Sequence, residues 1–203
     1  MRIFESTLSI LILFTSISAF AQTKNAAVVR TIEAYARSVD KLFAGQKEPD
    51  VVVADVSDYD SDKAEWRTFK SKTNLDTFRD KTETYSVAYI WRARGKIALV
   101  AFTKFSPSGD WAEYVTYYFR HDGSAAKVTS ELRTFYGDYL IIRERYFDPR
   151  GRLLKQTSKF LDLVTKKPKK PTKDVRDAIA GVTRSQYYKK VSALPFYSLL
   201  SSS

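Results

Sequence analysis

The sequence predicts an α+β domain: an N-terminal amphipathic helix packed on a curved antiparallel six-stranded meander, a half-barrel, with a basic C-terminal tail containing short helices. Three observations predict it. Apolar residues recur at helical spacing between Asn25 and Ala44, turn signals recur roughly every ten residues after Thr84, and a Lys/Pro run opens a basic tail. With 203 residues, 44% of them hydrophobic, the chain is long enough for one domain with a buried core.

Residues 1–21 have the pattern of a secretory signal peptide. An apolar run from Leu8 to Ile17 follows a short basic head, and Ala19-Phe20-Ala21 matches the small-residue cleavage pattern. Cleavage before Gln22 would export the mature chain to the periplasm or the medium, since the short serine-containing core is typical of bacteria. The run is too short to span a bilayer comfortably, so we expect no transmembrane segment in the mature chain. The predicted organisation is a signal peptide at 1–21, a helix and sheet domain at 22–165, and a basic Lys/Pro segment with a docked helical tail at 166–203.

The amphipathic helix is predicted from Asn25 to Ala44. Its apolar residues recur at alternating steps of four and three, which places them on one face. Asn25 can cap the first turn, and Gly45 suits the left-handed position just past the last turn. The residues expected to pack on the sheet are Val28, Ile32, Tyr35, Val39 and Leu42.

The stretch after this helix has weaker patterns. Val51–Val53 predicts a short strand, and Thr73–Arg79 predicts a helical turn. Between them, Asp58-x-Asp60-x-Asp62 has the spacing with which an EF-hand calcium loop begins. Lys63 stands where that loop needs glycine, and Phe69 stands where it needs the bidentate glutamate. We therefore expect a solvated acidic loop and no metal site.

Six strands are predicted where β-branched and aromatic residues lie between turn signals rich in Gly, Pro and Asp. Loops this short connect antiparallel neighbours, so the strands should form a meander. Large aromatic residues occupy both faces of the strand that begins at Trp111, which indicates a sheet covered or curled on both sides, and a strongly bent half-barrel around the helix explains this better than a flat sheet. The predicted strands are Thr84–Arg92, Lys96–Phe105, Trp111–Arg120, Lys127–Phe135, Tyr139–Phe147 and Arg152–Leu161.

The positive charge of the chain is concentrated in the tail. Residues 150–190 contain thirteen Lys or Arg and three Asp, a net charge of +10 against +11 for the whole chain. The run Lys166-Lys167-Pro168-Lys169-Lys170-Pro171 should be extended and exposed, because proline disfavours helix and inner strand. An ordinary solvated charge run is the simplest interpretation of this segment, and if it binds a partner, an anionic envelope surface is the most accessible one. The tail is expected to dock through Val175, Ile179, Tyr187, Val191, Leu194 and Phe196.

The last predicted hairpin contains the segment Tyr146-Phe147-Asp148-Pro149-Arg150-Gly151-Arg152-Leu153-Leu154. This segment resembles the tyrosine–aspartate hairpin unit of large bacterial secreted repeat proteins. The likeness covers nine residues of 203, so it implies a hairpin and not membership of that family. As architecture, a helix laid on a curved antiparallel sheet resembles the periplasmic lipoprotein carriers and the cone-shaped nuclear-transport-factor-like domains. A likeness of fold implies no function by itself.

Little in the sequence indicates catalysis. Cysteine is absent, which excludes disulfides, thiolate metal sites and cysteine nucleophiles, and the common nucleotide-binding and zinc-enzyme motifs are missing. His121, the one histidine, lies in a predicted turn and should face solvent. A two-carboxylate site could combine Glu113 with Glu131 or Glu144, although pairing of these residues with cross-strand arginines is the simpler expectation. No cofactor is expected.

These patterns favour a secreted or periplasmic non-enzymatic binding protein whose ligand is an apolar or amphipathic small molecule, with a basic tail for anionic surfaces. Export disfavours nucleic acid as a partner. The alternatives are a small cofactor-free enzyme of the nuclear-transport-factor-like class and a structural or partner-docking envelope module. An enclosed ionisable cavity would favour the enzyme, an open apolar groove the carrier, and a filled core the docking module. The predicted ligand-binding residues are Trp91, Tyr114, Tyr118, Arg143 and Arg145, and the predicted anionic-surface residues are Lys166, Lys167, Lys169 and Lys170.

Overall fold

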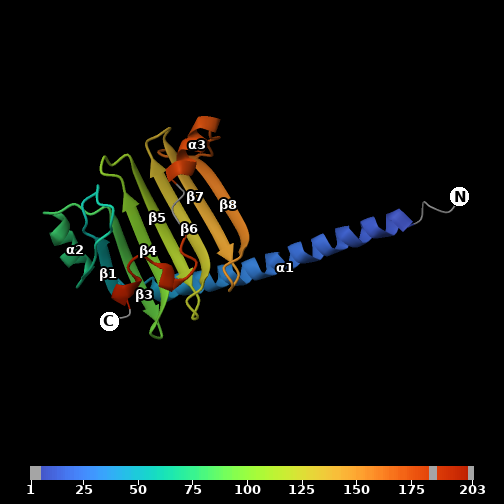
Figure 1. The fold of residues 1–203 in the computed structure, drawn as a ribbon, viewed down its shortest axis with the longest axis horizontal. Helices are drawn as coiled ribbons and strands as arrows, with labels where there is room; N and C mark the ends of the chain where they lie inside the picture. The colour runs from blue at the N-terminus through green and yellow to red at the C-terminus, as the bar shows by residue number, and fades with distance from the viewer. Residues whose placement is uncertain (1–5, 183–186, 201–203) are drawn as a thin grey trace.

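The computed structural model describes residues 6–182 and 187–200 and contains one open antiparallel sheet with helices against it (Figure 1). The first five residues of the predicted signal, and residues 183–186 and 201–203 of the predicted tail, lie outside the described residues. The elements in chain order are α1 (Ser6–Phe43), β1 (Val51–Asp55), β2 (Trp66–Phe69), α2 (Lys72–Arg79), β3 (Ser86–Ala93), β4 (Lys96–Phe105), β5 (Trp111–Phe119), β6 (Ala125–Thr134), β7 (Tyr139–Phe147), β8 (Leu153–Asp162), α3 (Lys173–Val182), a 3₁₀ turn η1 (Val191–Ala193) and α4 (Tyr197–Leu200).

The sheet has eight strands in the order β2-β1-β3-β4-β5-β6-β7-β8. Strands β3 to β8 follow one another along the chain, which confirms the α+β class and the predicted meander. The prediction of six strands is wrong, because β1 pairs with β3 and β2 pairs with β1. Strand β2 has four residues and exposes both Arg67 and Thr68, so this short edge strand has no apolar alternation from which it could be predicted.

The hairpin between β7 and β8 explains the segment that resembles the tyrosine–aspartate unit. The Asp148 carboxylate accepts hydrogen bonds from the backbone N–H groups of Arg150 (3.0 Å) and Arg152 (2.8 Å). Gly151 N–H donates to the Asp148 carbonyl (2.9 Å) and has a φ of +77°, a conformation that glycine adopts without strain. Asp, Pro and Gly at this spacing are therefore a local solution to chain reversal.

The C-terminal part of helix α1, from Val29 to Phe43, covers one face of the sheet (Figure 1). It begins at Ser6, well before the predicted start at Asn25, and its N-terminal part extends beyond β8 in Figure 1. No helix in the described part of the chain combines the length and apolarity that crossing a bilayer requires. The residues that α1 buries are Val29, Ile32, Ala36, Val39 and Phe43.

The predicted helix face is therefore only partly right. Ile32 and Val39 are buried as predicted and Tyr35 is half-buried, but Val28 is 37% exposed and Leu42 is 60% exposed. Two stripes with the same spacing of three and four pass through Ile32 and Val39. The sequence favours the stripe that contains Tyr35, whereas the stripe buried in the structure contains Ala36, which packs in one cluster with Val39, Phe43 and Leu99.

A polar cluster also fixes α1 to the sheet. Lys127 of β6 is only 8% exposed, and its ammonium contacts Glu33 of α1 (3.1 Å) and Glu144 of β7 (2.8 Å). Burial alone would raise the pKa of Glu144, but the hydrogen bond and charge of Lys127, together with hydrogen bonds from Tyr146 and Thr157, hold that pKa below its usual value. Tyr146 donates a hydrogen bond to Glu33, and Tyr118 donates one to Asp40 (2.8 Å).

Residues 187–200, which we call the C-terminal segment, cover the opposite face of the sheet. Tyr117 packs against Tyr188 of this segment, while the next residue, Tyr118, packs under α1, because successive residues of a strand point to opposite faces. Phe196 is fully buried and its ring centroid lies 4.8 Å from that of Trp66. Of the residues expected to dock the tail, Ile179 has a side chain outside the described part of the structure. The others that contact the sheet core are Val175, Tyr187, Val191, Leu194 and Phe196.

Replacing Ile32 with Ala should lower the free energy of unfolding by about 2 to 5 kcal/mol, because truncation of this buried side chain leaves a cavity between α1 and the sheet. The matched control is Leu42→Ala, a truncation on the exposed side of the same helix, which should change that free energy by less than about 0.5 kcal/mol. Urea unfolding followed by circular dichroism measures both. Equal losses in the two variants would contradict the packing of α1 described above.

Candidate anionic-surface site

The five predicted ligand-binding residues are divided between the two faces of the sheet. Trp91 and Tyr118 lie under α1, in contact with its buried stripe, and Tyr114 lies further along the same face, partly exposed. Arg143 and Arg145 project from the other face, where the Arg145 guanidinium lies 3.7 Å from the centre of the Tyr187 ring. These residues therefore do not meet around one ligand.

The candidate catalytic carboxylates are divided in the same way. Glu113 is buried on the face that carries Val115 and Tyr117. Glu131 and Glu144 lie on the α1 face, where Arg133 contacts Glu131 at 2.7 Å. The sheet itself thus separates Glu113 from both possible partners. Among the described residues, no three metal-ligating side chains gather into a group.

Hollow regions occur at the ends of strands and beside α1. Their volumes are about 310, 260, 520 and 300 Å³. Helix α1 and the C-terminal segment cover the middle of the sheet on its two faces. Three of these four hollows lie at turns and loops at the ends of strands.

One corner of the molecule exposes apolar and basic side chains together. Phe135 (65% exposed) and Tyr136 (55%) lie in the turn between β6 and β7, and Val164 (81%) lies in the loop after β8. The two segments are joined by a hydrogen bond from Leu163 N–H to the Asp138 carbonyl (2.9 Å). We call this surface the basic corner, and it comprises Phe135, Tyr136, Val164, Lys166, Lys167, Lys169 and Lys170.

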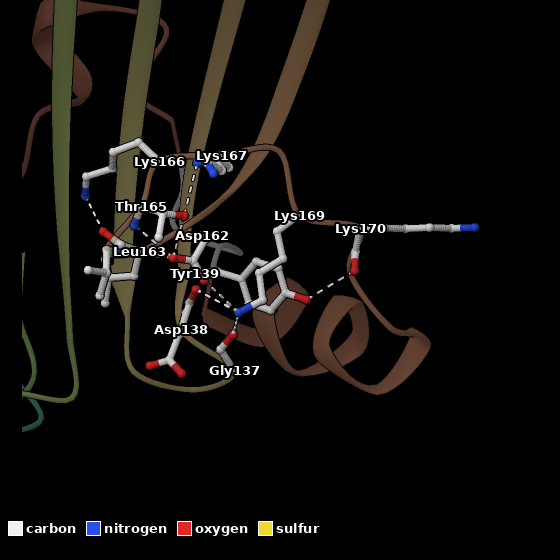
Figure 2. A network of polar contacts seen from close by, with 11 residues as sticks. Gly137, Asp138, Tyr139, Asp162, Leu163, Thr165, Lys166, Lys167, Lys169 and Lys170 are labelled. Carbon is white, nitrogen blue, oxygen red and sulfur yellow. Dashed lines mark hydrogen bonds and ion pairs between the residues drawn. The ribbon is translucent and has the colours of Figure 1, made fainter.

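Asp162, the last residue of β8, organises the basic corner (Figure 2). Its carboxylate accepts hydrogen bonds from the N–H (2.9 Å) and hydroxyl (3.0 Å) of Thr165 and from the Lys169 ammonium (3.2 Å). The two bonds from Thr165, and then the one from Lys169, lower the pKa of Asp162 to about 2. The loop is therefore held by a carboxylate that stays charged in all but strongly acidic solution.

Lys169 differs from the other three lysines. Its ammonium also contacts the Gly137 carbonyl (2.8 Å) and lies 4.8 Å from the centre of the Tyr139 ring, so it ties the loop to the β6–β7 turn. Lys166, Lys167 and Lys170 are exposed, and Figure 2 shows the Lys170 side chain extending away from the loop. The sequence treats the four lysines as equivalent, whereas in the structure Lys169 positions the charges that the other three present.

The apolar part of the basic corner was not predicted. Phe135 is assigned by its pattern to a strand end, Tyr136 to a turn, and Val164 to no particular role. The available signal is the aromatic pair directly before Gly137-Asp138, since turns are usually polar. What brings this pair beside the lysines is the pairing of β7 with β8, which places the ends of distant segments together.

The Asp162 carboxyl should remain ionised in the folded protein at about pH 3, where an ordinary Asp is mostly protonated. Its folded pKa lies below the ordinary value of 3.8, so its charge stabilises the loop above that value and this contribution disappears as pH falls through about 2. Carbon-13 NMR of the side-chain carboxyl measures the titration. Lys169→Gln should raise this pKa, and Lys167→Gln, which removes an equal charge from the same loop, should change it much less. A wild-type midpoint near 3.8 would refute the described contacts.

Known proteins provide no guide to this site. No protein-family model matches the chain, and no significant match was found among curated proteins or solved structures. The function therefore has to be inferred from the chemistry of the described surface.

Proposed function

We propose that the protein is an exported, non-enzymatic binding protein that docks on anionic phospholipid surfaces through the basic corner. The observation that carries the proposal is the exposure of Phe135, Tyr136 and Val164 on the same corner as Lys166, Lys167 and Lys170. Aromatic and aliphatic side chains enter the headgroup region of a bilayer, while lysines are attracted to its negative charge. The lysines would draw the corner to the membrane surface, and the apolar side chains would then hold it there by entering the headgroup region.

The charge distribution supports this orientation. Of the four lysines in the basic corner, the described structure gives an ion pair only to Lys169. The other three ammonium groups therefore carry charge that no described carboxylate neutralises. Near an anionic membrane each such lysine contributes about 1 kcal/mol of attraction, and salt screens most of it.

The covered sheet favours docking over enclosure of a small ligand. We identify the expected apolar or amphipathic ligand with the lipid surface itself. That surface is amphipathic, and binding to it requires no cavity. The two-carboxylate site considered for a small enzyme of the nuclear-transport-factor-like class would need Glu113 beside Glu131 or Glu144, and the sheet separates Glu113 from both. A docking module for an envelope protein is the remaining alternative, and it predicts no affinity for lipid alone.

Wild-type protein should bind vesicles that contain phosphatidylglycerol, and Lys166→Gln, Lys167→Gln and Lys170→Gln together should weaken binding by up to about 1 kcal/mol per lysine at low salt. The matched control replaces Lys63, Lys70 and Lys81, three exposed lysines outside the basic corner, with Gln. Phe135→Ser should weaken binding at high salt as well, because its contribution is apolar. Vesicle flotation measures all four proteins. Equal weakening by both triple variants, or no binding by the wild type, would refute docking through the basic corner.

The export part of the proposal predicts a processed N-terminus. Mass spectrometry of protein from its native host should find a chain that begins at Gln22 or within a few residues of it, because Ala19-Phe20-Ala21 fits the cleavage pattern. The same measurement on cytoplasmic and envelope fractions locates the mature chain. An intact Met1 on abundant cytoplasmic protein would contradict export.

A further inference from the structure

A second site lies at the opposite ends of the strands from the basic corner. A cavity of about 310 Å³ is lined by the β3–β4 turn, the β5–β6 turn and the C-terminal segment. From its charge and its apolar wall, we propose that this cavity binds a small phosphate monoester that carries an apolar group. The proposal is independent of membrane docking, because none of the residues of the basic corner lines the cavity.

The walls of the cavity are fixed by backbone contacts. Val191 N–H donates to the Gly123 carbonyl (2.9 Å), and Ala125 N–H donates to the Lys189 carbonyl (2.9 Å), so the C-terminal segment is tied to the β5–β6 turn. The Arg92 guanidinium donates to the Leu200 carbonyl (2.9 Å), which ties the same segment to β3. A site whose walls are already in place loses little conformational entropy when a ligand binds.

The cavity has an excess of positive charge. Arg92, Lys96 and Lys190 line it, and none of them forms an ion pair with a described residue. Asp122 is the carboxylate in the lining, but it accepts hydrogen bonds from the N–H (2.8 Å) and hydroxyl (2.6 Å) of Ser124. Those bonds hold the pKa of Asp122 below its usual value and commit the carboxylate to the turn. Three positive side chains and one carboxylate leave the cavity with a net charge of +2, which matches a ligand with two negative charges.

The apolar residues of the cavity indicate that the ligand carries an apolar group beside its phosphate. Ile97, Val191, Tyr197 and Leu200 contribute apolar surface beside the cations. A volume of about 310 Å³ lies at the lower end of the range for small-molecule sites. An aromatic or short aliphatic phosphate monoester fits both the size and the division into a charged and an apolar side. Inorganic phosphate would use only the charged side.

Isothermal titration calorimetry with phenyl phosphate tests the proposal on the full chain. The wild type should bind phenyl phosphate more tightly than inorganic phosphate, and Lys96→Gln with Lys190→Gln should weaken phenyl phosphate binding at least tenfold. Both lysines are exposed, so the double variant should fold, which its thermal unfolding checks. Lys166→Gln with Lys167→Gln is the matched control, with the same charge change at the other end of the sheet, and should bind phenyl phosphate as the wild type does.

NMR and vesicles complete the test. Phenyl phosphate should shift the amide signals of Gly95 and Gly123, which line the cavity. If Lys96→Gln with Lys190→Gln also weakens binding to vesicles that contain phosphatidic acid, the phosphate belongs to a lipid headgroup, and if vesicle binding is unchanged, the ligand is a soluble ester. No heat and no amide shifts at millimolar phenyl phosphate, or equal weakening in the control pair, would overturn the assignment. Those results would leave docking through the basic corner unaffected, because that proposal is tested by other variants.

Discussion

Every other feature of this fold depends on the need to cover both faces of the central strands. Tyr117 and Tyr118 are adjacent in β5, and both are buried, so neither face of the sheet can be left to solvent. Helix α1 covers one face and the C-terminal segment covers the other. The two covers are held differently: α1 by the Lys127 cluster and a narrow apolar stripe, the C-terminal segment by aromatic packing and backbone hydrogen bonds. Lys127 pairs with two carboxylates, Glu33 and Glu144, and this pairing makes its burial tolerable.

Covering both faces moves the functional surface to the ends of the strands. Hairpin turns and the loops beside them are then the places where side chains can meet a partner without disturbing the core. The two ends differ in kind. The basic corner exposes apolar side chains beside Lys166, Lys167 and Lys170, which pair with no described carboxylate, whereas the opposite end gathers Arg92, Lys96 and Lys190 around a cavity. A broad partner suits the first and a small anion suits the second.

The local parts of the fold were predictable from the sequence, and the long-range parts were not. Turn signals such as Asp148-Pro149-Arg150-Gly151 act through neighbouring backbone groups, so β3 to β8 and their order could be inferred. The edge strand β2 has no such signal, because its four residues show no apolar alternation and it is a strand only through its pairing with β1. For the same reason Trp91 and Arg145 could not be assigned to opposite faces, since one shift of strand register exchanges the faces. The lysines of the basic corner were identified by composition, but their apolar neighbours depend on the tertiary arrangement.

The Lys/Pro run also determines how the sheet ends. Lys169 N–H donates to the Phe160 carbonyl (3.0 Å) and Asp162 N–H donates to the Lys167 carbonyl (2.8 Å), so the run pairs with the outer side of β8 at its C-terminal end. Pro168 stands between these bonds and has no N–H to offer a further strand. An open strand edge is a template for aggregation, and proline flanked by lysines blocks it by removing a donor and adding repulsion between copies. We therefore expect these six residues to disfavour pairing of another chain with this end of β8.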